Sequence, residues 1–334
     1  MVTRYADAFD LNQSTQGKSR LSCISPCRGE FLQLARNVEL ASRAPSGEAC
    51  RLHSGGRVMP VSKIVVGVDH SDRSDRALRR GFEIAAAHDA DVIVEYALDV
   101  GSSQKLKSLL ERVAVEETRE RAGQIAGAAS IKYKVDATAG RPFQVLRDVG
   151  KDCEADLIVL GTHRSGKDHS IFAGSTARRL INEAPAPVLI VGSPPEAPYR
   201  RVLVGFDDSP AARKAFQFAR MLAPDARFTV LTACMIPFSS RNEDPVLKQQ
   251  VEDDARRMTI EALGKQGVTD PGEVEIVTRV GESFGTILKV QREVQPDLLV
   301  LGTSMPALYR QMFGGGIVDM IAADPPCDLL VVKS

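Results

Sequence analysis

A loop with the composition of an anion-binding turn lies near the middle of the chain. The segment GTHRSGKDHSIFAGST, residues 161–176, starts with a glycine after an apolar run and closes on Gly174, Ser175 and Thr176. Backbone N–H groups and hydroxyls at a helix N-terminus, together with the helix dipole, favour a phosphate group. Arg164 stands where close backbone approach to an anion would favour another glycine. The segment therefore predicts a phosphate-binding loop, and Arg164 determines whether a phosphate can still enter it.

Three roles for Arg164 are open at this point. If its φ is positive, an L-residue costs about 1–2 kcal/mol and the loop is remodelled. If its φ is negative, the guanidinium can bind a phosphate in a bidentate manner. In the third case it pairs with Asp168 and covers an empty pocket. We expect a loop that still binds its ligand.

A carboxylate, Asp69, directly follows the apolar run KIVVGV at 63–68. Ligands of open parallel sheets bind beyond the carboxyl ends of strands, where the strand order reverses. If the strands ending at Asp69 and Gly161 are neighbours, the two residues face one crevice, and the chemistry fits an adenine nucleotide with its ribose or base on Asp69. The alternative is structural: Asp69 only caps the next helix and Gly174 only opens the last one. Spacing alone leaves both readings open.

The elements that must position these residues form an internal repeat, which is best detected before the fold is assigned. SKIVVGVDHSDRSDRAL (62–78) is repeated as YRRVLVGFDDSPAARKAF (199–216), and GRPFQVLRDVGKDCEADLIVLGTH (140–163) as GESFGTILKVQREVQPDLLVLGTS (281–304). Strands alternate with helices in each copy, which predicts βαβ units and a doubly wound parallel sheet. The first helix of the first copy is expected to follow Ser71, and Ser209 is an expected helix N-cap with Pro210 at the first helical position. The expected domains are 61–193 and 199–334, joined by a proline-containing linker.

Length, charge and cysteine usage narrow the class of protein. The 334 residues suffice for about two domains of roughly 150 residues. Lys+Arg and Asp+Glu both number 43, so we expect no nucleic-acid partner. No apolar run approaches the ~20 residues of a membrane span, and six widely spaced cysteines favour reduced thiols and a cytoplasmic location. Residues 1–59 are expected to be a disordered extension, and Met59 is an alternative translation start.

The sequence offers little for catalysis. His163 and His169 are six positions apart on a loop, which is not the spacing of a helical zinc site. Cys153 lies among acids that oppose thiolate formation, and Cys327 is expected in the core. The G-x-S-x-G, Walker and G-x-G-x-x-G motifs are missing. We expect no enzyme and no metal site, with slow ATP hydrolysis or phosphate transfer to Ser175 or Thr176 left open.

The repeated motifs resemble the universal stress protein family over residues 61–334. The resemblance rests on VGVDHS at 66–71, ADLIVLGTH at 155–163, GST at 174–176 and APVLIV at 186–191. It implies an α/β fold of two tandem doubly wound five-stranded parallel sheets, order 3-2-1-4-5, of the adenine nucleotide α-hydrolase-like type. It also implies a stress-response role and, in one branch of the family, bound ATP recognised by the pattern G-x2-G-x9-G-[ST].

This pattern can be matched to the chain residue by residue. Its first glycine falls on Gly161, its last on Gly174 and its hydroxyl residue on Ser175, with the expected separation of the two glycines. Arg164 departs from the pattern at the middle glycine, which puts ATP binding in question.

The resemblance places further contacts outside the pattern. The family's adenine-side acid falls on Asp69, its backbone contact at the end of the second strand near Ala97, and its phosphate-side loop on His163. The expected nucleotide-binding residues, with ATP and Mg²⁺ as ligand, are Val68, Asp69, Ala97, Gly161, His163, Arg164, Gly174, Ser175 and Thr176.

The second copy departs further from the pattern. Met305 takes the middle position, and the closing triplet at 314–316 contains only glycine. We therefore expect one copy to bind nucleotide and the other to support the fold. The residues of a weak second site would be Asp207, Gly302, Gly315 and Gly316.

The last strand of each copy suggests how the copies associate. An apolar edge strand left open invites pairing, and family members resemble each other in dimerising through this strand. PVLIVG (187–192) and CDLLVVK (327–333) would then join the copies as an internal pseudo-dimer. A homodimer is left open. The alternative function is a stress protein without nucleotide that acts through protein–protein interaction.

Overall fold

A computed structural model describes residues 61–98, 104–127, 130–162, 175–194, 197–236, 244–270, 272–304 and 316–334. The predicted extension at 1–59 and the alternative start at Met59 lie outside these residues. We refer to residues 61–194 as the first half and 197–334 as the second half. None of the described helices is long and apolar enough to cross a membrane.

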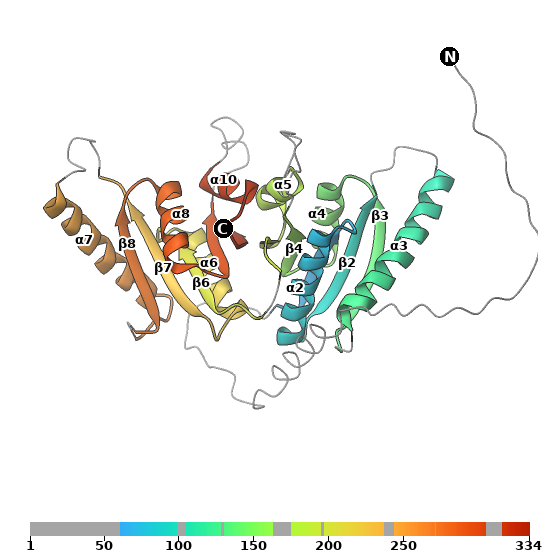
Figure 1. The fold of residues 1–334 in the computed structure, drawn as a ribbon, viewed down its shortest axis with the longest axis horizontal. Helices are drawn as coiled ribbons and strands as arrows, with labels where there is room; N and C mark the ends of the chain where they lie inside the picture. The colour runs from blue at the N-terminus through green and yellow to red at the C-terminus, as the bar shows by residue number, and fades with distance from the viewer. Residues whose placement is uncertain are drawn as a thin grey trace, which may run out of the picture.

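The first half alternates strands and helices as the repeat predicted (Figure 1). Its elements are β1 (Lys63–Val68), α2 (Asp72–His88), β2 (Asp91–Leu98), α3 (Gln104–Ala126), β3 (Tyr133–Ala139), α4 (Pro142–Asp152), β4 (Leu157–Gly161), α5 (Ser175–Glu183) and β5 (Val188–Val191).

The second half repeats this order. Its elements are β6 (Arg201–Gly205), α6 (Pro210–Leu222), β7 (Arg227–Cys234), α7 (Pro245–Gly264), β8 (Val274–Val280), α8 (Ser283–Val294), β9 (Leu298–Thr303), α10 (Ile317–Ala323) and β10 (Asp328–Lys333).

The strands of both halves form one sheet in the order β3-β2-β1-β4-β5-β10-β9-β6-β7-β8. Each half therefore has the expected order 3-2-1-4-5, and its strands run parallel. β1 lies beside β4, with Ile64 opposite Leu157. The strand order reverses between these two strands, so their carboxyl ends open on a common crevice.

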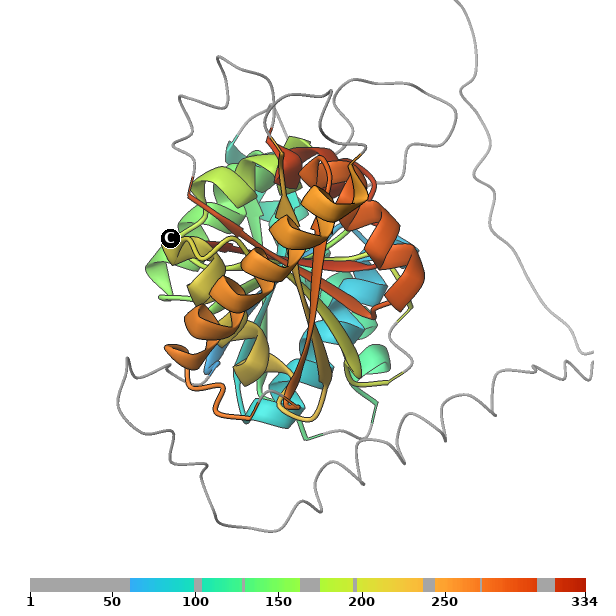
Figure 2. The same ribbon diagram turned by 90° about the vertical axis from the view of Figure 1, so that its left-hand side faces the viewer.

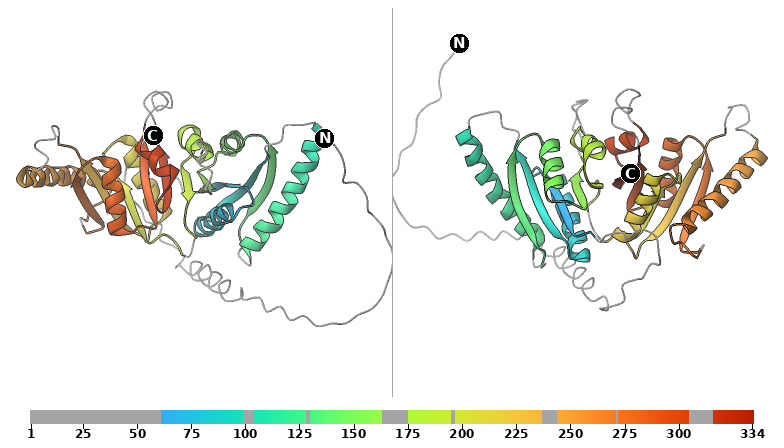
Figure 3. Two further views of the ribbon diagram at one scale, coloured as in Figure 1. Left: turned by 45° about the horizontal axis from the view of Figure 1, so that its top comes forward. Right: turned by 180° about the vertical axis from the view of Figure 1, so that it is seen from behind.

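Helices cover both faces of the sheet (Figure 2), and each face carries an apolar cluster. Leu78 and Phe82 of α2 share one cluster with Phe216 of α6 and Leu263 of α7. Leu146 of α4, Leu180 of α5, Ile287 of α8 and Ile321 of α10 belong to the cluster on the other face. α3 and α7 lie at opposite ends of the molecule (Figure 3). Because β1, β4, β6 and β9 are buried on both sides, their sequences are near-continuous apolar runs.

The two halves meet where β5 pairs with β10 in antiparallel orientation, with Leu189 opposite Leu330. α5 and α10 lie next to each other above this junction (Figure 1).

A buried polar cluster lies at the same junction. Asp328 accepts hydrogen bonds from the backbone N–H of Gly192 at 2.9 Å and from the Tyr199 hydroxyl at 2.7 Å. The Arg80 guanidinium lies 3.4 Å from Asp328 and stacks 4.1 Å from the centre of the Tyr199 ring. Arg80 also donates to Glu83 at 2.6 Å. A buried charge needs such partners, so this cluster ties α2 of the first half to β10 of the second.

Candidate functional site

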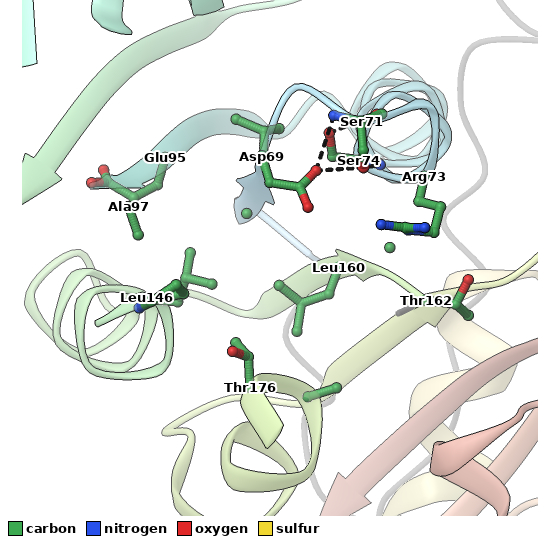
Figure 4. Close-up of a pocket in the computed structure, with 15 residues that line it drawn as sticks. Asp69, Ser71, Arg73, Ser74, Glu95, Ala97, Leu146, Leu160, Thr162 and Thr176 are labelled. Atoms are coloured by element: carbon green, nitrogen blue, oxygen red, sulfur yellow. Dashed lines mark hydrogen bonds between the residues drawn. The ribbon is translucent and has the colours of Figure 1, made fainter. Parts of the chain in front are cut away.

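A cavity of about 280 Å³ opens at the carboxyl ends of β1, β2 and β4 in the first half (Figure 4). This volume is close to the lower end of the ~300–1,000 Å³ range of ligand pockets. The cavity is lined by Gly67, Val68, Asp69, Ser71, Arg73, Ser74, Glu95, Ala97, Pro142, Leu146, Leu160, Gly161, Thr162, Thr176 and Ala177.

Asp69 lies at the turn between β1 and α2, where it orders the start of the helix. Its Oδ1 accepts hydrogen bonds from the Ser71 backbone N–H at 3.0 Å and from the Ser71 hydroxyl at 2.5 Å. α2 follows Ser71 as predicted; Ser71 is its N-cap, and its hydroxyl accepts from the Ser74 N–H at 3.3 Å. Burial alone would raise the pKa of Asp69, but hydrogen bonds from Ser71 and Ser74 and the charge of Arg73 hold it below its usual value. The carboxylate is therefore ionised and faces the cavity while it stabilises the turn.

Gly161 ends β4 against the backbone of α2. A Cβ added there would lie 2.6 Å from the Arg73 carbonyl oxygen and 3.1 Å from the Ser74 backbone nitrogen. Its φ is not among the positive values of the described glycines. The sequence suggested that a glycine is needed here for a sharp exit from the strand. The structure shows instead that it is needed because β4 packs closely on the first turn of α2.

One side of the cavity is basic and hydroxylic. Arg73, from the first turn of α2, and Thr162, just after β4, lie on the same side of Asp69 (Figure 4). Thr176 lies in the first turn of α5, which begins at Ser175. A guanidinium, hydroxyls and a helix N-terminus are groups that bind anions. This side is suited to phosphate.

The opposite side carries a buried acid that the sequence analysis did not select. Glu95 of β2 is 1% exposed, and its Oε1 has no hydrogen-bond partner among the described residues. Burial raises the pKa of Glu95 to about 7, although a hydrogen bond from Thr138 opposes this shift. The sequence contained a signal for it: DVIVEYAL places an acid inside a strand that a parallel sheet buries on both faces.

The structure brings together five of the expected site residues. Val68, Asp69, Ala97, Gly161 and Thr176 all line the cavity. Ser175 begins α5, next to Thr176. The other expected positions, His163, Arg164 and Gly174, lie outside the described residues and stay predictions. Sequence reasoning missed Arg73, Ser74, Glu95 and Thr162.

The corresponding region of the second half keeps the turn but has other side chains. Asp207 Oδ1 accepts from the Ser209 N–H at 3.1 Å, and Ser209 caps α6 with Pro210 at the first position, as expected. A Cβ at Gly302 would lie 2.5 Å from the Ala212 backbone nitrogen. Gly315 lies outside the described residues.

α10 of the second half is capped by its own acid. Asp319 accepts from the Gly316 backbone N–H at 3.1 Å. It also lies 3.4 Å from Arg178 of α5. A carboxylate of the chain thus already occupies the N-terminus where a phosphate would otherwise bind.

The described cysteines and His70 show no catalytic arrangement. Burial raises the pKa of Cys327 to about 12 and also raises that of Cys153, so both favour the thiol form. His70 bonds the Thr118 hydroxyl at 2.7 Å and stacks on Tyr96, which holds α3 against the β1 turn. The described residues contain no cluster of three metal-ligating side chains.

Comparisons with known proteins agree with this architecture. The sequence profile of the universal stress protein family matches residues 60–192 and again 198–333. A universal stress protein of Methanocaldococcus jannaschii is 31% identical over 141 residues, 40% of this chain and 82% of that protein. One of Mycolicibacterium smegmatis is 24% identical over 287 residues, 81% of this chain and 96% of that protein. The crystal structure of a universal stress protein from Archaeoglobus fulgidus has a TM-score of 0.63 at 18% identity, covering 82% of this chain and 98% of that one.

Proposed function

The chain belongs to the universal stress protein family as a tandem member, and from this we propose that its first half binds an adenine nucleotide, ATP with Mg²⁺. The protein would act in the stress response as a sensor or regulator whose state depends on the bound nucleotide. The second half would support the fold and pair with the first through β5 and β10.

The observation that carries this proposal is the shared cavity of the first half. It joins the Asp69 carboxylate, the Arg73 guanidinium and the Thr176 hydroxyl in one crevice at the strand-order reversal. Leu146 and Leu160 supply an apolar surface between these polar groups (Figure 4). Ligand sites typically combine such apolar surface with a few convergent polar groups.

These groups suit the parts of a nucleotide. The ionised Asp69 would accept hydrogen bonds from ribose hydroxyls or a base amino group. Arg73, Thr176 and the N-terminus of α5 would bind phosphate oxygens. Mg²⁺ would be held mainly by the phosphates, as is usual for this ion in nucleotide sites. The remaining expected contacts, Val68, Ala97 and the 163–175 segment, belong to the same proposal.

The proposed role is binding without catalysis. No pair of nucleophile and general base is found among the described cavity residues, where Asp69 is engaged with Ser71 and Glu95 lies 1% exposed. ATP binding and release by the first half would then be the event that partners detect.

Calorimetry of the full chain with Mg-ATP tests the proposal. We expect saturable binding of about one ATP per chain, lost in Asp69→Ala and kept in Asp207→Ala. Asp207 is the matched control because it accepts from the backbone N–H of the N-cap serine of α6, as Asp69 does at α2. No binding by the folded wild type, or equal loss in both variants, would contradict a nucleotide site in the first half and favour a stress protein that acts through protein partners alone.

A further inference from the structure

We propose that Glu95 is the specificity-determining residue of this cavity and that its buried carboxyl group reads the edge of an adenine base. The inference rests on the proposed function, because it assigns the base-binding side of the same site. Glu95 lies outside the pattern G-x2-G-x9-G-[ST], which marks the ATP-binding branch of the family.

The position of Glu95 points to a ligand contact. Its side chain is 1% exposed, yet it lines the cavity next to Ala97 of the same strand. Oε1 is buried without a hydrogen-bond partner among the described residues. A buried carboxyl oxygen without a partner is costly in a folded protein. A ligand that hydrogen-bonds this oxygen would remove that cost.

The surroundings of Glu95 favour its neutral form, although a hydrogen bond from Thr138 opposes this. From β3, Asp136 faces it and raises its pKa, while Lys134 lowers it but is paired with Asp136 at 2.9 Å. From α4 the cavity receives Pro142 and Leu146, which carry no charge. Asp69, in the turn after β1, lies between Glu95 and Arg73 in the view of Figure 4. Burial is the largest influence, and the pKa of about 7 leaves the acid form well populated at neutral pH.

A neutral carboxyl has one donor and one acceptor side by side. Adenine presents the complementary pair, the N7 acceptor beside the N6 amino donor, whereas guanine presents two acceptors, N7 and O6, on the same edge. Glutamine reads adenine through the same pair of bonds. Arg73 lies across the cavity from Glu95, so a ligand with its base at Glu95 directs its anionic groups towards the guanidinium (Figure 4).

The test compares wild type, Glu95→Gln and Glu95→Leu in the full chain, with Mg-ATP and Mg-GTP titrated at pH 6 and pH 8. Gln imitates the neutral acid at every pH, and Leu is the residue of the second half at the equivalent position, Leu231. If only the neutral form binds, wild-type affinity for ATP falls about tenfold between pH 6 and pH 8. Glu95→Gln is expected to lack this fall and to keep the pH 6 affinity within about threefold.

Glu95→Leu is expected to lose about tenfold or more in ATP affinity, the effect of one unmade hydrogen bond. Wild type is expected to bind GTP about tenfold more weakly than ATP at pH 6. Glu95→Gln retains the other groups whose protonation can change in this range, including the ATP phosphate and His70, so the difference between its pH profile and that of wild type belongs to Glu95. Thermal melts check that each variant is folded. If Glu95→Leu does not fold, the comparison of the pH profiles of wild type and Glu95→Gln tests the proposal.

ATP binding with identical pH profiles in wild type and Glu95→Gln, or unchanged affinity in folded Glu95→Leu, would overturn the role of Glu95 and leave the nucleotide site standing. Absence of ATP binding by wild type at both pH values would overturn the site and the role together.

Discussion

The crevices at the ends of β1 and β6 have the same backbone design and different chemistry. Both have an aspartate that orders an N-cap serine, Asp69 with Ser71 and Asp207 with Ser209. Both have a non-glycine residue of positive φ in this turn, His70 at 60° and Asp208 at 57°. In both halves the strand beside this turn has a glycine packed against helix backbone, Gly161 at the end of β4 and Gly302 one residue before the end of β9.

The side chains around this shared backbone differ. Matching the halves through the strand registers and the repeat pairs four polar residues of the first cavity with apolar ones of the second half. The pairs are Arg73 with Ala211, Ser74 with Ala212, Glu95 with Leu231 and Thr176 with Ile317. The fold thus requires the turn, the cap and the glycine, but it does not require the polar groups. Their presence in one half only is the reason for assigning them to a ligand.

The largest expected loss of folding stability concerns the junction of the halves. Its buried acid, Asp328, has no counterpart in the first half, where Pro187 takes the equivalent position. Asp328→Ala leaves the buried Arg80 without its 3.4 Å partner and removes the acceptor for Tyr199. Breaking a buried pair in this way costs about 3–5 kcal/mol. Urea denaturation should show this loss, whereas Asp148→Ala, which removes an exposed partner of Arg147, should change stability by less than about 1 kcal/mol. Equal effects of the two changes would contradict a structural role for the junction cluster.

The next largest effect is a pH dependence of folding stability that Glu95 introduces and that its counterpart Leu231, which does not titrate, cannot produce. The folded-state pKa of Glu95 is about 7, above its ordinary 4.5. Between these values the folded protein holds a proton that the unfolded chain releases, so this contribution is complete below about pH 4.5 and is lost as pH rises through 7. We expect the stability of wild type relative to Glu95→Gln to fall by up to about 3 kcal/mol between pH 5 and pH 8. A difference that does not change with pH would show that Glu95 is ionised throughout.

Substitution of the paired glycines should affect both halves alike. Gly161→Ala and Gly302→Ala each place a methyl group 2.5–2.6 Å from helix backbone, and overpacking of this kind costs about 1–3 kcal/mol. Gly264→Ala is the control, because a Cβ there meets nothing within 4 Å and should stabilise by up to about 1 kcal/mol. A loss in one half only would show that the two turns are not equivalent.

These glycines show how far sequence reasoning reached. The apolar runs and the repeat predicted alternating strands and helices in a doubly wound parallel sheet, the family resemblance implied the strand order, and the Ser209 cap followed from residue type and position alone. Gly161 was selected correctly but for another reason, since the approach of α2 to β4 is a tertiary contact that no local pattern contains.

The polar residues of the cavity were harder to predict. Arg73 reads as an ordinary first-turn residue until α2 is placed against the end of β4. Glu95 was visible as an acid in a buried strand, but the sequence did not show that its side chain borders a cavity. Side-chain patterns predict burial, whereas a cavity depends on where several elements fail to fill space. The repeat itself held the best signal, because comparing the copies position by position isolates the polar exceptions.

The smallest expected effect compares the two N-caps. Ser71→Ala and Ser209→Ala each remove the side-chain acceptor for a first-turn N–H, at 3.3 Å for Ser74 and 3.2 Å for Ala212. Each should cost about 1 kcal/mol, measured by urea denaturation. Only Ser71 also donates its hydroxyl to the cavity aspartate, at 2.5 Å. Ser71→Ala should therefore weaken Mg-ATP binding as well, and Ser209→Ala should leave it unchanged. If the two variants lose the same stability but only Ser71→Ala binds Mg-ATP more weakly, the cap is a shared structural feature and the ligand contact belongs to the first half alone. If both variants bind Mg-ATP equally well, the ligand lies away from Asp69.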